Sequence, residues 1–370
     1  MTTIINGSSP SITFSDGSAQ TSATRPFQNR IINGACVIDQ RNAGAAFTPT
    51  NNTYCVDRWF YELSQASKFS GQQNQGSVTP PVGFRNYLGS TVTSAVTVGS
   101  TDYFLLTQII EGFNVADLMW GTANAKAITL SFQVYSSLTG TFGGSLCNSA
   151  QDRVYPFSYT VSSANTWTTV SVTIAGDTSG TWLTTNGVGI KVRFGLGVGS
   201  TYSGTAGAWG STLYFSATGA TSVVGTNGAT FYITGVQLEV GSTATSFDYR
   251  PYGTELQLCQ RYFYRSLNAS ASTGYNPNIL ATRWTTNQAV LSIPCPVPLR
   301  TTPSISKSGT IYIYAGGTSI TLGSVIAVPT NYSVFTCYPN VRVDATGILG
   351  STAWVCEYDV NAYFEVSAEL

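Results

Sequence analysis

The segment from Thr230 to Arg265, TFYITGVQLEVGSTATSFDYRPYGTELQLCQRYFYR, constrains the fold more than any other part of the chain. Phe231 and Ile233 set one period-2 register, and Gly235 then interrupts it. The apolar residues that follow resume the alternation displaced by one position. A strand that carries a bulge produces this displaced pattern, so we expect a bulged strand that closes a β-domain.

The same segment then changes to a helical pattern. Thr254 with Gln257 three residues later has the form of a capping box. The apolar residues that recur at helical spacing are Leu256, Cys259 and Phe263. We therefore expect a short linking helix over residues 253–265, after which a second β-domain begins.

Composition favours a nearly all-β chain throughout. Charged residues make up 9% of the sequence, against roughly 25% in an ordinary soluble domain, while aromatic residues reach 12%. Short alternating runs separated by Gly, Asn and Ser clusters are typical of β-sandwiches. A length of 370 residues exceeds one such sandwich. We expect an N-terminal arm (1–28), a central sandwich (29–252), the linking helix (253–265) and a smaller C-terminal sandwich (266–370).

The N-terminal arm carries a hairpin pattern. Ile12 and Phe14 alternate with polar residues before an Asp16-Gly17 turn. Because the arm is too short to form a core of its own, we interpret it as an attachment or trimerisation element that is ordered by a partner. The alternative is a frayed terminus.

Two partner classes are disfavoured by the charge and hydropathy patterns. The chain has 17 basic and 17 acidic residues, and the basic ones are scattered, so nucleic acid is not an expected partner. No apolar run approaches 18 residues, and the first basic residue is Arg25, which argues against a membrane-spanning helix and a Sec-type signal. We expect folding in a cytoplasm.

The seven cysteines form no CxxC pair. They are interpreted as buried free thiols, since Cys is among the most buried residue types. A disulfide between Cys337 and Cys356 remains an alternative, although a reducing compartment opposes it. Because the chain contains no histidine, we expect no structural zinc and no cofactor.

The absence of histidine also excludes Ser-His-Asp and Cys-His catalysis. A glycan depolymerase would need two carboxylates about 5 Å or about 6.5–9.5 Å apart. The acids dense enough to supply them are Asp57, Glu62, Asp102, Glu111 and Asp117. The alternative is that these acids pair with Arg58, Arg85 or Lys68, cap turns or bind calcium. No solenoid repeat is present, so we assign no catalytic residue and expect no enzyme.

Several strands can be assigned from period-2 alternation. In 127–135 four apolar residues alternate strictly with polar ones or Tyr135, which predicts one core face and one wet face. Trp59, Tyr61 and Leu63 share one face of another strand, with Arg58 and Glu62 on the other. The outward glycines of 188–198 indicate a closely approaching backbone or partner.

Large aromatic residues in Gly-rich loops are the candidate glycan-binding residues. They are Trp120, Trp182, Tyr202 and Trp209. Sugar rings stack an apolar C–H face on Trp or Tyr, and loops on a rigid sandwich provide such positions. The alternative is that each of them plugs the core or contacts another subunit.

The C-terminal part continues the β pattern. The prolines of 293–299 place that run in an edge strand or a loop, because proline cannot donate to a sheet ladder. Further strands are expected around Ile311 to Tyr314, Trp354 to Tyr358 and Phe364 to Val366. The density of tyrosine favours a protein or glycan contact surface.

Several motifs resemble tailed-bacteriophage virion proteins. The first is GVQLEVG followed by a Pro-Tyr turn and a CQRY helix; the others are NRIINGACVIDQRNAG with YCVDRW (29–59), FGLGVGSTYSGTAGAW (194–209), SPSITFSDGSAQTSA (9–23), RTTPSIS (300–306) and the terminal SAEL. The resemblance implies a tail-fibre or other surface-appendage component with a central jelly roll like a carbohydrate-binding module.

The resemblance leaves three functions to consider. The leading one is a homotrimeric tail fibre of the virion, assembled in the host cytoplasm, whose arm docks on other virion proteins and whose loops bind host-surface polysaccharide. The second is a capsid decoration or head-fibre protein, and the third is a glycan depolymerase. Threefold symmetry suits weak sugar contacts, because linked sites raise the effective concentration.

Overall fold

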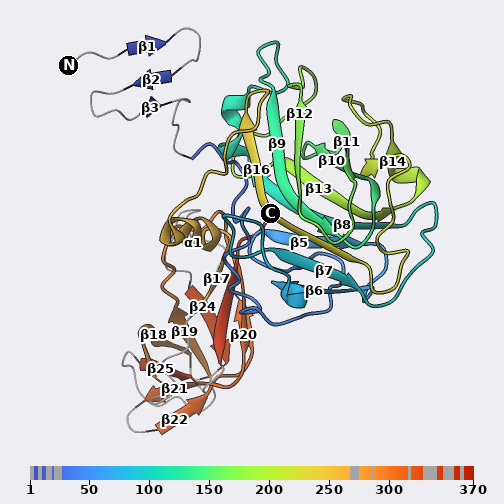
Figure 1. The fold of residues 1–370 in the computed structure, drawn as a ribbon. Helices are drawn as coiled ribbons and strands as arrows, with labels where there is room; N and C mark the ends of the chain where they lie inside the picture. The colour runs from blue at the N-terminus through green and yellow to red at the C-terminus, as the bar shows by residue number, and fades with distance from the viewer. Residues whose placement is uncertain are drawn as a thin grey trace.

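The computed structural model describes residues 4–6, 11–13, 19–20, 27–266, 275–285, 287–315, 318–327, 340–344, 354–358 and 362–370. Within these ranges the chain is nearly all β, with one α-helix and a few short 3-10 turns (Figure 1). The predicted fold class is therefore confirmed. No helix in the described ranges has the length and hydropathy needed to cross a membrane.

Two antiparallel sheets form the central jelly-roll sandwich. The six-stranded sheet has the order β11 (Val154–Val161), β10 (Gly140–Cys147), β13 (Val188–Val198), β8 (Tyr103–Glu111), β5 (Trp59–Leu63) and β4 (Thr53–Tyr54). The five-stranded sheet has the order β12 (Thr168–Ile174), β9 (Ile128–Ser136), β16 (Thr230–Val240), β7 (Leu88–Val92) and β6 (Phe69–Gln73). Strands that follow one another in sequence often lie in opposite sheets, so the core is closed by long-range contacts.

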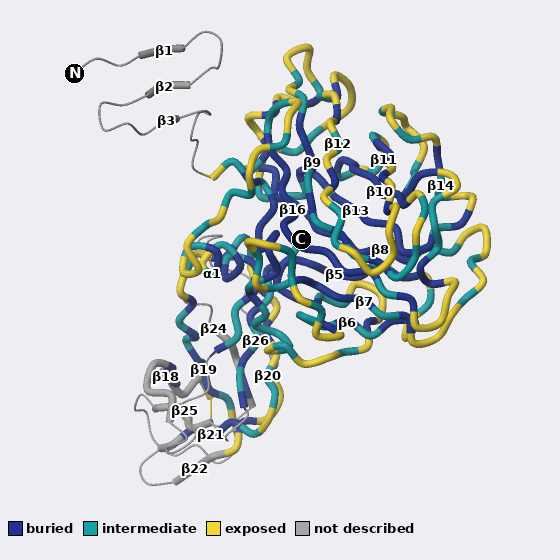
Figure 2. The backbone as a smooth tube through the Cα atoms, in the orientation of Figure 1, coloured by how far each residue is buried: buried dark blue, intermediate teal, exposed yellow. Residues whose placement is uncertain are grey.

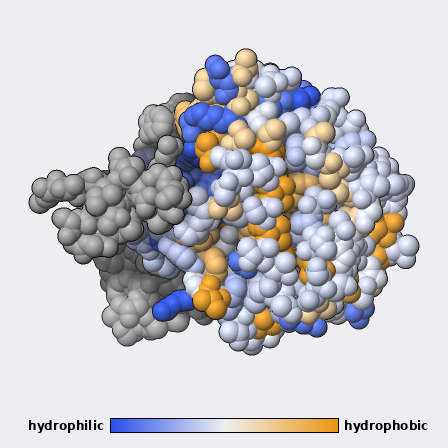
Figure 3. Space-filling view, turned by 45° about the horizontal axis from the view of Figure 1, so that its top comes forward, coloured by the Kyte–Doolittle hydropathy of each residue, from blue (hydrophilic) through white to orange (hydrophobic). Residues whose placement is uncertain are grey.

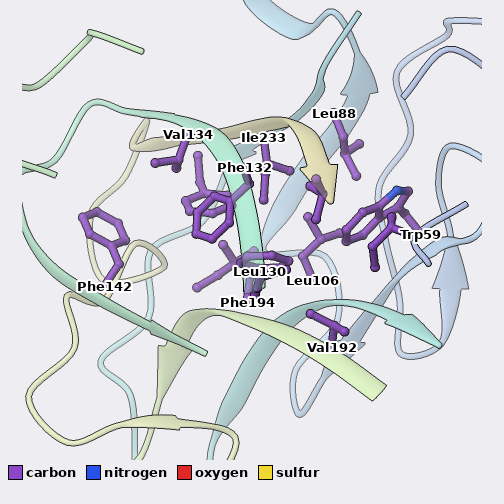
Figure 4. Packing of buried hydrophobic residues seen from close by; sticks show 14 of the residues in the cluster. Trp59, Leu88, Leu106, Leu130, Phe132, Val134, Phe142, Val192, Phe194 and Ile233 are labelled. Atoms are coloured by element: carbon purple, nitrogen blue, oxygen red, sulfur yellow. The ribbon is translucent and has the colours of Figure 1, made fainter. Parts of the chain in front are cut away.

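The core lies between these two sheets, as the dark-blue strands of Figure 2 show. Phe132 of β9 meets Phe194 of β13 with ring centroids 5.0 Å apart, and Trp59 of β5 lies 6.1 Å from the same ring (Figure 4). The apolar face predicted for 127–135 does point into this core. Its other face is less exposed to solvent than predicted, because Thr129 is fully buried and its hydroxyl donates to the Gly241 carbonyl.

The bulge predicted in the opening segment is present in β16. Pairing with β9 shifts register between Thr234 and Gln237, and Gly235 adopts φ 61°. A Cβ at Gly235 would lie 2.5 Å from the Phe84 ring. Glycine is thus required both by the left-handed backbone and by the close approach of Phe84.

The outward glycines of β13 predicted that a backbone or a partner approaches closely. A segment of the same chain makes this approach. The short strands β14 (Ser203–Gly204) and β15 (Ser216–Ala217) belong to a segment that covers the six-stranded sheet. A Cβ on Gly143 or Gly195 would lie 2.4 Å or 2.8 Å from the Ser216 hydroxyl. The outer face of this sheet is consequently closed over part of its area.

The linking helix differs from its prediction at both ends. Helix α1 spans Tyr252–Gln260, and Pro251 precedes it without a side-chain cap, so the Thr254 capping box is wrong. Proline fixes φ directly before the first turn, and the N-cap position lies three residues earlier than predicted, at Pro251. Beyond the helix, Phe263–Arg265 forms β17, because its backbone pairs with β26 (Tyr363–Ser367).

Two further sheets build the C-terminal part. A three-stranded sheet has the order β17, β26 and β20 (Ser304–Ser308). A seven-stranded sheet has the order β22 (Thr318–Thr321), β21 (Ile311–Ala315), β25 (Trp354–Tyr358), β18 (Tyr275–Thr285), β19 (Gln288–Ser292), β24 (Asn340–Asp344) and β23 (Val325–Ala327). Ile313 and Phe364, from different sheets, belong to one buried cluster. The proline-rich run 293–299 is a connection, as predicted.

The N-terminal arm is described only in part. Strands β1 (Ile4–Asn6), β2 (Ser11–Thr13) and β3 (Ala19–Gln20) form a small antiparallel sheet. Ile12 lies in β2 and pairs with Gln20, whereas Phe14 falls outside the described residues. The attachment role of the arm stays a prediction.

The cysteine interpretation is confirmed where side chains are described. Cys36, Cys55, Cys147 and Cys259 are fully buried free thiols. Burial raises the pKa of the Cys36 thiol to about 12. Cys337 lies outside the described residues, so the alternative disulfide stays untested.

The two sandwiches meet in a charged junction close to α1 (Figure 1). Arg58 is 1% exposed; it pairs with Glu369, donates to the Ile109 carbonyl at 2.6 Å and stacks 3.6 Å above the Tyr262 ring. Arg41 reaches the same Glu369 carboxylate at 2.9 Å. In a chain with 9% charged residues, this concentration of ion pairs ties the C-terminal strand to the central sandwich.

Candidate functional site

Three of the predicted glycan-binding residues come together at one end of the central sandwich. The ring centroids of Trp120 and Trp182 are 4.7 Å apart, and Trp209 lies 5.2 Å from Trp120 and 5.5 Å from Trp182. The interplanar angles of 75–82° make each pair edge-to-face. We call these three residues the tryptophan triad.

The triad is bound to the loops around it. Trp120 is 7% exposed, belongs to the core, and donates its indole N–H to the Lys126 carbonyl at 2.7 Å. Trp209 donates to the Ala175 carbonyl at 2.7 Å, and Trp182 also bonds to a main-chain carbonyl. Since no indole N–H is left for a ligand, the triad first of all closes the end of the sandwich. Only the partly exposed rings of Trp182 and Trp209 can contact a sugar.

Tyr202, the fourth predicted residue, lies in another cluster. Its ring stacks on Phe215 at 4.6 Å and meets Tyr103 edge-on at 5.9 Å. Phe215 in turn covers the Arg193 guanidinium at 4.7 Å. Tyr202 therefore holds the covering segment of the six-stranded sheet and does not extend the triad.

A second aromatic surface, on the open face of the five-stranded sheet, was missed by sequence reasoning. Tyr135 of β9 and Trp167, just before β12, are both partly exposed and lie 5.5 Å apart. Tyr232 of β16 stacks on Tyr135 at 5.4 Å with an interplanar angle of 6°, and Tyr87 stacks on Tyr232 at 5.2 Å. We call Tyr135 and Trp167, supported by the buried Tyr232 and Tyr87, the aromatic platform.

The platform is rigid. Tyr232 and Tyr87 are 3% and 0% exposed. The Tyr87 hydroxyl donates to the Gln75 carbonyl at 2.6 Å, and the Trp167 indole N–H donates to the Thr79 carbonyl at 2.8 Å. The exposed rings are thus held in place by buried rings and by backbone bonds, which lowers the entropy cost of binding a ligand.

Neutral polar groups lie beside the platform. Gln133 and Thr169, paired across β9 and β12, share hydrogen bonds of 2.9 and 3.1 Å. Ser131 and Ser171 form the next pair along the same two strands. Ring faces flanked by hydroxyl and amide groups suit a neutral sugar, whose C–H face stacks while its hydroxyls hydrogen-bond. The alternation of 127–135 already placed Tyr135 outward, but only the sheet brought Trp167 to it.

The five acids considered for glycan cleavage are all engaged. Glu111 pairs with Arg261 at 2.7 Å and accepts the Tyr262 hydroxyl at 2.6 Å. Asp102 accepts from Ser64 and Gln65. The remaining ion pairs, given as acid and base, are Asp57 with Arg41, Glu62 with Arg193 and Asp117 with Arg30.

The partners predicted for these acids were wrong. Arg58 pairs with Glu369 instead, and within the described ranges neither Arg85 nor Lys68 forms an ion pair. The reason is register: β5, β8 and β13 lie side by side, which brings Arg193 to Glu62 across 131 residues. Burial raises the pKa of the Glu62 carboxyl, but the charge and hydrogen bonds of Arg193 outweigh it, so the pKa is lowered.

No protein-family model matches the chain, and no curated protein matches it in sequence. Solved structures match at low similarity. One is the enzymatically active domain of tailspike protein 4 of bacteriophage CBA120, at 12% identity and a TM-score of 0.33, covering 59% of this chain and 22% of that chain.

Carbohydrate-binding modules are also among the matches. A family 4 module is 15% identical with a TM-score of 0.28, covering 56% of this chain and 98% of its own. A family 11 module from Clostridium thermocellum, in complex with a β-1,3-1,4-mixed-linked tetrasaccharide, is 12% identical with a TM-score of 0.28, covering 55% and 99%. At these scores the likenesses carry no argument about function.

Proposed function

We propose that this protein is a surface component of a tailed-phage virion, a homotrimeric tail fibre that binds neutral sugars of the host-surface polysaccharide on the aromatic platform. The observation that carries the binding proposal is the pair of partly exposed rings of Tyr135 and Trp167, fixed from below by buried tyrosines. The virion assignment rests on the motifs shared with phage appendage proteins.

The surface chemistry supports binding of a neutral polymer. The outward side chains of β12 and β9 beside the platform are Ser, Thr and Gln. Figure 3 shows another sign of low charge: one face of the molecule is mostly pale, with scattered apolar patches and few strongly hydrophilic ones. Stacking of one sugar on one aromatic ring gives weak affinity, so a trimer with three platforms is the arrangement that holds a particle on a polysaccharide.

Binding is proposed rather than cleavage. Each acid that could have served a hydrolase is held by an arginine or by hydroxyl and amide donors. A carboxylate whose oxygens already accept hydrogen bonds or ion pairs from the protein is not free to protonate a glycosidic oxygen or to activate a water. The virion location, the arm as the docking element and the trimer belong to the same proposal.

The test is adsorption of purified protein to host cells and to the polysaccharide extracted from them. Trp167→Ala should lower adsorption at least about tenfold in a trimer, since the loss at each platform multiplies across the sites. Phe113→Ala removes an aromatic ring that is 54% exposed outside the platform and is the matched control. Equal adsorption of both variants would refute the platform.

The oligomer and the location need separate measurements. Sedimentation of the wild type should give a trimer of 39.3 kDa chains at micromolar concentration. Immunogold labelling of virions with an antibody against residues 266–370 should mark the tail. Label spread over the head would replace the tail-fibre proposal with the capsid-decoration alternative.

A further inference from the structure

A cavity of about 380 Å³ opens beside the start of α1, and its lining includes no residue of the platform or the triad. It lies between the loops around residues 35 and 83 and the segment that enters the helix. Its lining residues are Ala35, Val37, Gly83, Arg85, Phe247, Tyr249, Arg250, Tyr252 and Glu255. We call it the junction pocket, because it is formed where the central sandwich meets the linking helix.

Aromatic rings form one side of the junction pocket. Phe247 and Tyr249 meet edge-to-face at 4.7 Å, and Phe84 packs against both at 5.2 and 5.5 Å. Phe84 is itself seated over Gly235, the bulge residue of β16. Tyr249 and Tyr252 remain 53% and 64% exposed, unusually high for rings of this size.

The charges of the junction pocket do not cancel. Glu255 is occupied: it pairs with Arg250 at 3.2 Å and accepts the backbone N–H of Asn33. Arg85 is exposed and forms no ion pair or hydrogen bond with any described residue. The charged residues that line the pocket are two arginines, Arg85 and Arg250, and one acid, Glu255, so the lining carries one excess positive charge.

A further feature favours an anion. The guanidinium of Arg250 is held in place beneath the pocket, where it donates to the Ile31 and Asn29 carbonyls and pairs with Glu255. Helix α1 also begins at this pocket, so its unpaired first-turn N–H groups add partial positive charge. An exposed cation, Arg85, that pairs with no described acid, together with the start of a helix at the same cavity, favours an anionic ligand.

We propose that the junction pocket binds one carboxylate-bearing sugar residue of an acidic polysaccharide. A volume of about 380 Å³ suits a pyranose ring with part of its neighbour. The sugar ring contacts Tyr249 and Tyr252, and its carboxylate meets the guanidinium of Arg85, whose planar fork matches a carboxylate. The platform supplies no cation for this purpose, so the two surfaces select different units of a polymer.

The inference has its own site and does not require the platform. Calorimetric titration of the full chain with trigalacturonate is the test, with the same trisaccharide reduced at its carboxyl groups as the neutral control. We expect the acidic trisaccharide to bind at least about tenfold more tightly than the reduced one, and its affinity to fall as salt is raised.

Variants locate the site. Arg85→Gln should weaken trigalacturonate binding about fivefold, and Tyr252→Ala should weaken it while leaving the fold intact, since that ring is 64% exposed. Lys126→Gln removes an exposed cation elsewhere and should change nothing. Trp167→Ala should also leave this binding unchanged, so failure of the platform and failure of the junction pocket are told apart.

Three results would overturn the proposal. They are equal affinity for the acidic and the reduced trisaccharide, no heat of binding up to millimolar trigalacturonate, and wild-type affinity in Arg85→Gln. If Lys126→Gln weakened binding as much as Arg85→Gln, the effect would be one of net charge and the pocket would not be the site.

Discussion

Replacing Glu369 by Gln should loosen the attachment of the C-terminal strand to the central sandwich. Its carboxylate is 7% exposed and receives both Arg41, at 2.9 Å, and Arg58, whose side chain is 1% exposed. Glutamine keeps the shape but removes the charge, which leaves Arg58 buried without a counter-ion. Breaking a buried ion pair by removing one partner costs about 3–5 kcal/mol.

Strand β26, which ends shortly before Glu369, offers a matched control. Glu365 pairs with Arg265 at 2.5 Å, but their side chains are 31% and 22% exposed, so water can replace the lost partner. Exposed pairs contribute about 0–1 kcal/mol. We therefore expect Glu365→Gln to cost under about 1 kcal/mol and Glu369→Gln at least about 3 kcal/mol.

Urea unfolding followed by circular dichroism measures both free energies, and limited proteolysis shows which part opens first. The Glu369→Gln variant should be cut in the C-terminal sandwich at a urea concentration at which Glu365→Gln is intact. Equal midpoints for the two variants would refute the argument, because burial of the pair would then not determine its contribution. That result would mean that the Arg58 guanidinium is satisfied by another partner or by water once Glu369 is replaced.

Three further outcomes are expected. Burial raises the pKa of the Asp57 carboxyl to about 6 despite Arg41 nearby, so between about pH 4 and 6 the folded chain keeps a proton on Asp57 that the unfolded chain has lost. The free energy of unfolding should therefore fall by up to about 3 kcal/mol as pH rises from about 4 to 6, and Asp57→Asn should remove this pH dependence of the urea midpoint. Gly235→Ala should cost at least about 1–2 kcal/mol in thermal unfolding, since φ is 61° and Phe84 occupies the space of a Cβ; a change within error would mean that the bulge relaxes. Trp120→Ala should cost about 3–5 kcal/mol by the same assay because that ring is 7% exposed within the core, and a loss under 1 kcal/mol would contradict its role in closing the sandwich.

The sequence predicted the structure best where the relevant pattern lies within one segment. Alternation placed the apolar face of 127–135 in the core, and the displaced register around Gly235 predicted the bulge, because a strand's side-chain period is set by its own backbone. The absence of long helical periods determined the nearly all-β class. The thiols were predicted to be buried on residue type alone, and the five whose burial the structure describes are buried.

Local patterns failed where the backbone obtained its hydrogen bonds from elsewhere. Phe263–Arg265 has helical spacing with α1 but lies in a strand, since pairing with β26 satisfies its N–H and C=O groups. The helix starts at Tyr252, directly after Pro251, rather than after the Thr254 capping box. Both errors lie at element boundaries, where competing partners differ by little free energy.

The aromatic residues show the division between sequence and tertiary structure most clearly. The chain by itself showed that large rings occur in Gly-rich loops and that Tyr135 faces outward, because composition and side-chain period are properties of a segment. Only the packed sheets decided that Trp120, Trp182 and Trp209 meet as a triad, that Trp167 joins Tyr135, and that Arg85 borders the junction pocket with no acid of the described ranges paired to it. These groups come from segments far apart in the chain, and their meeting depends on strand order and register, which long-range pairing determines.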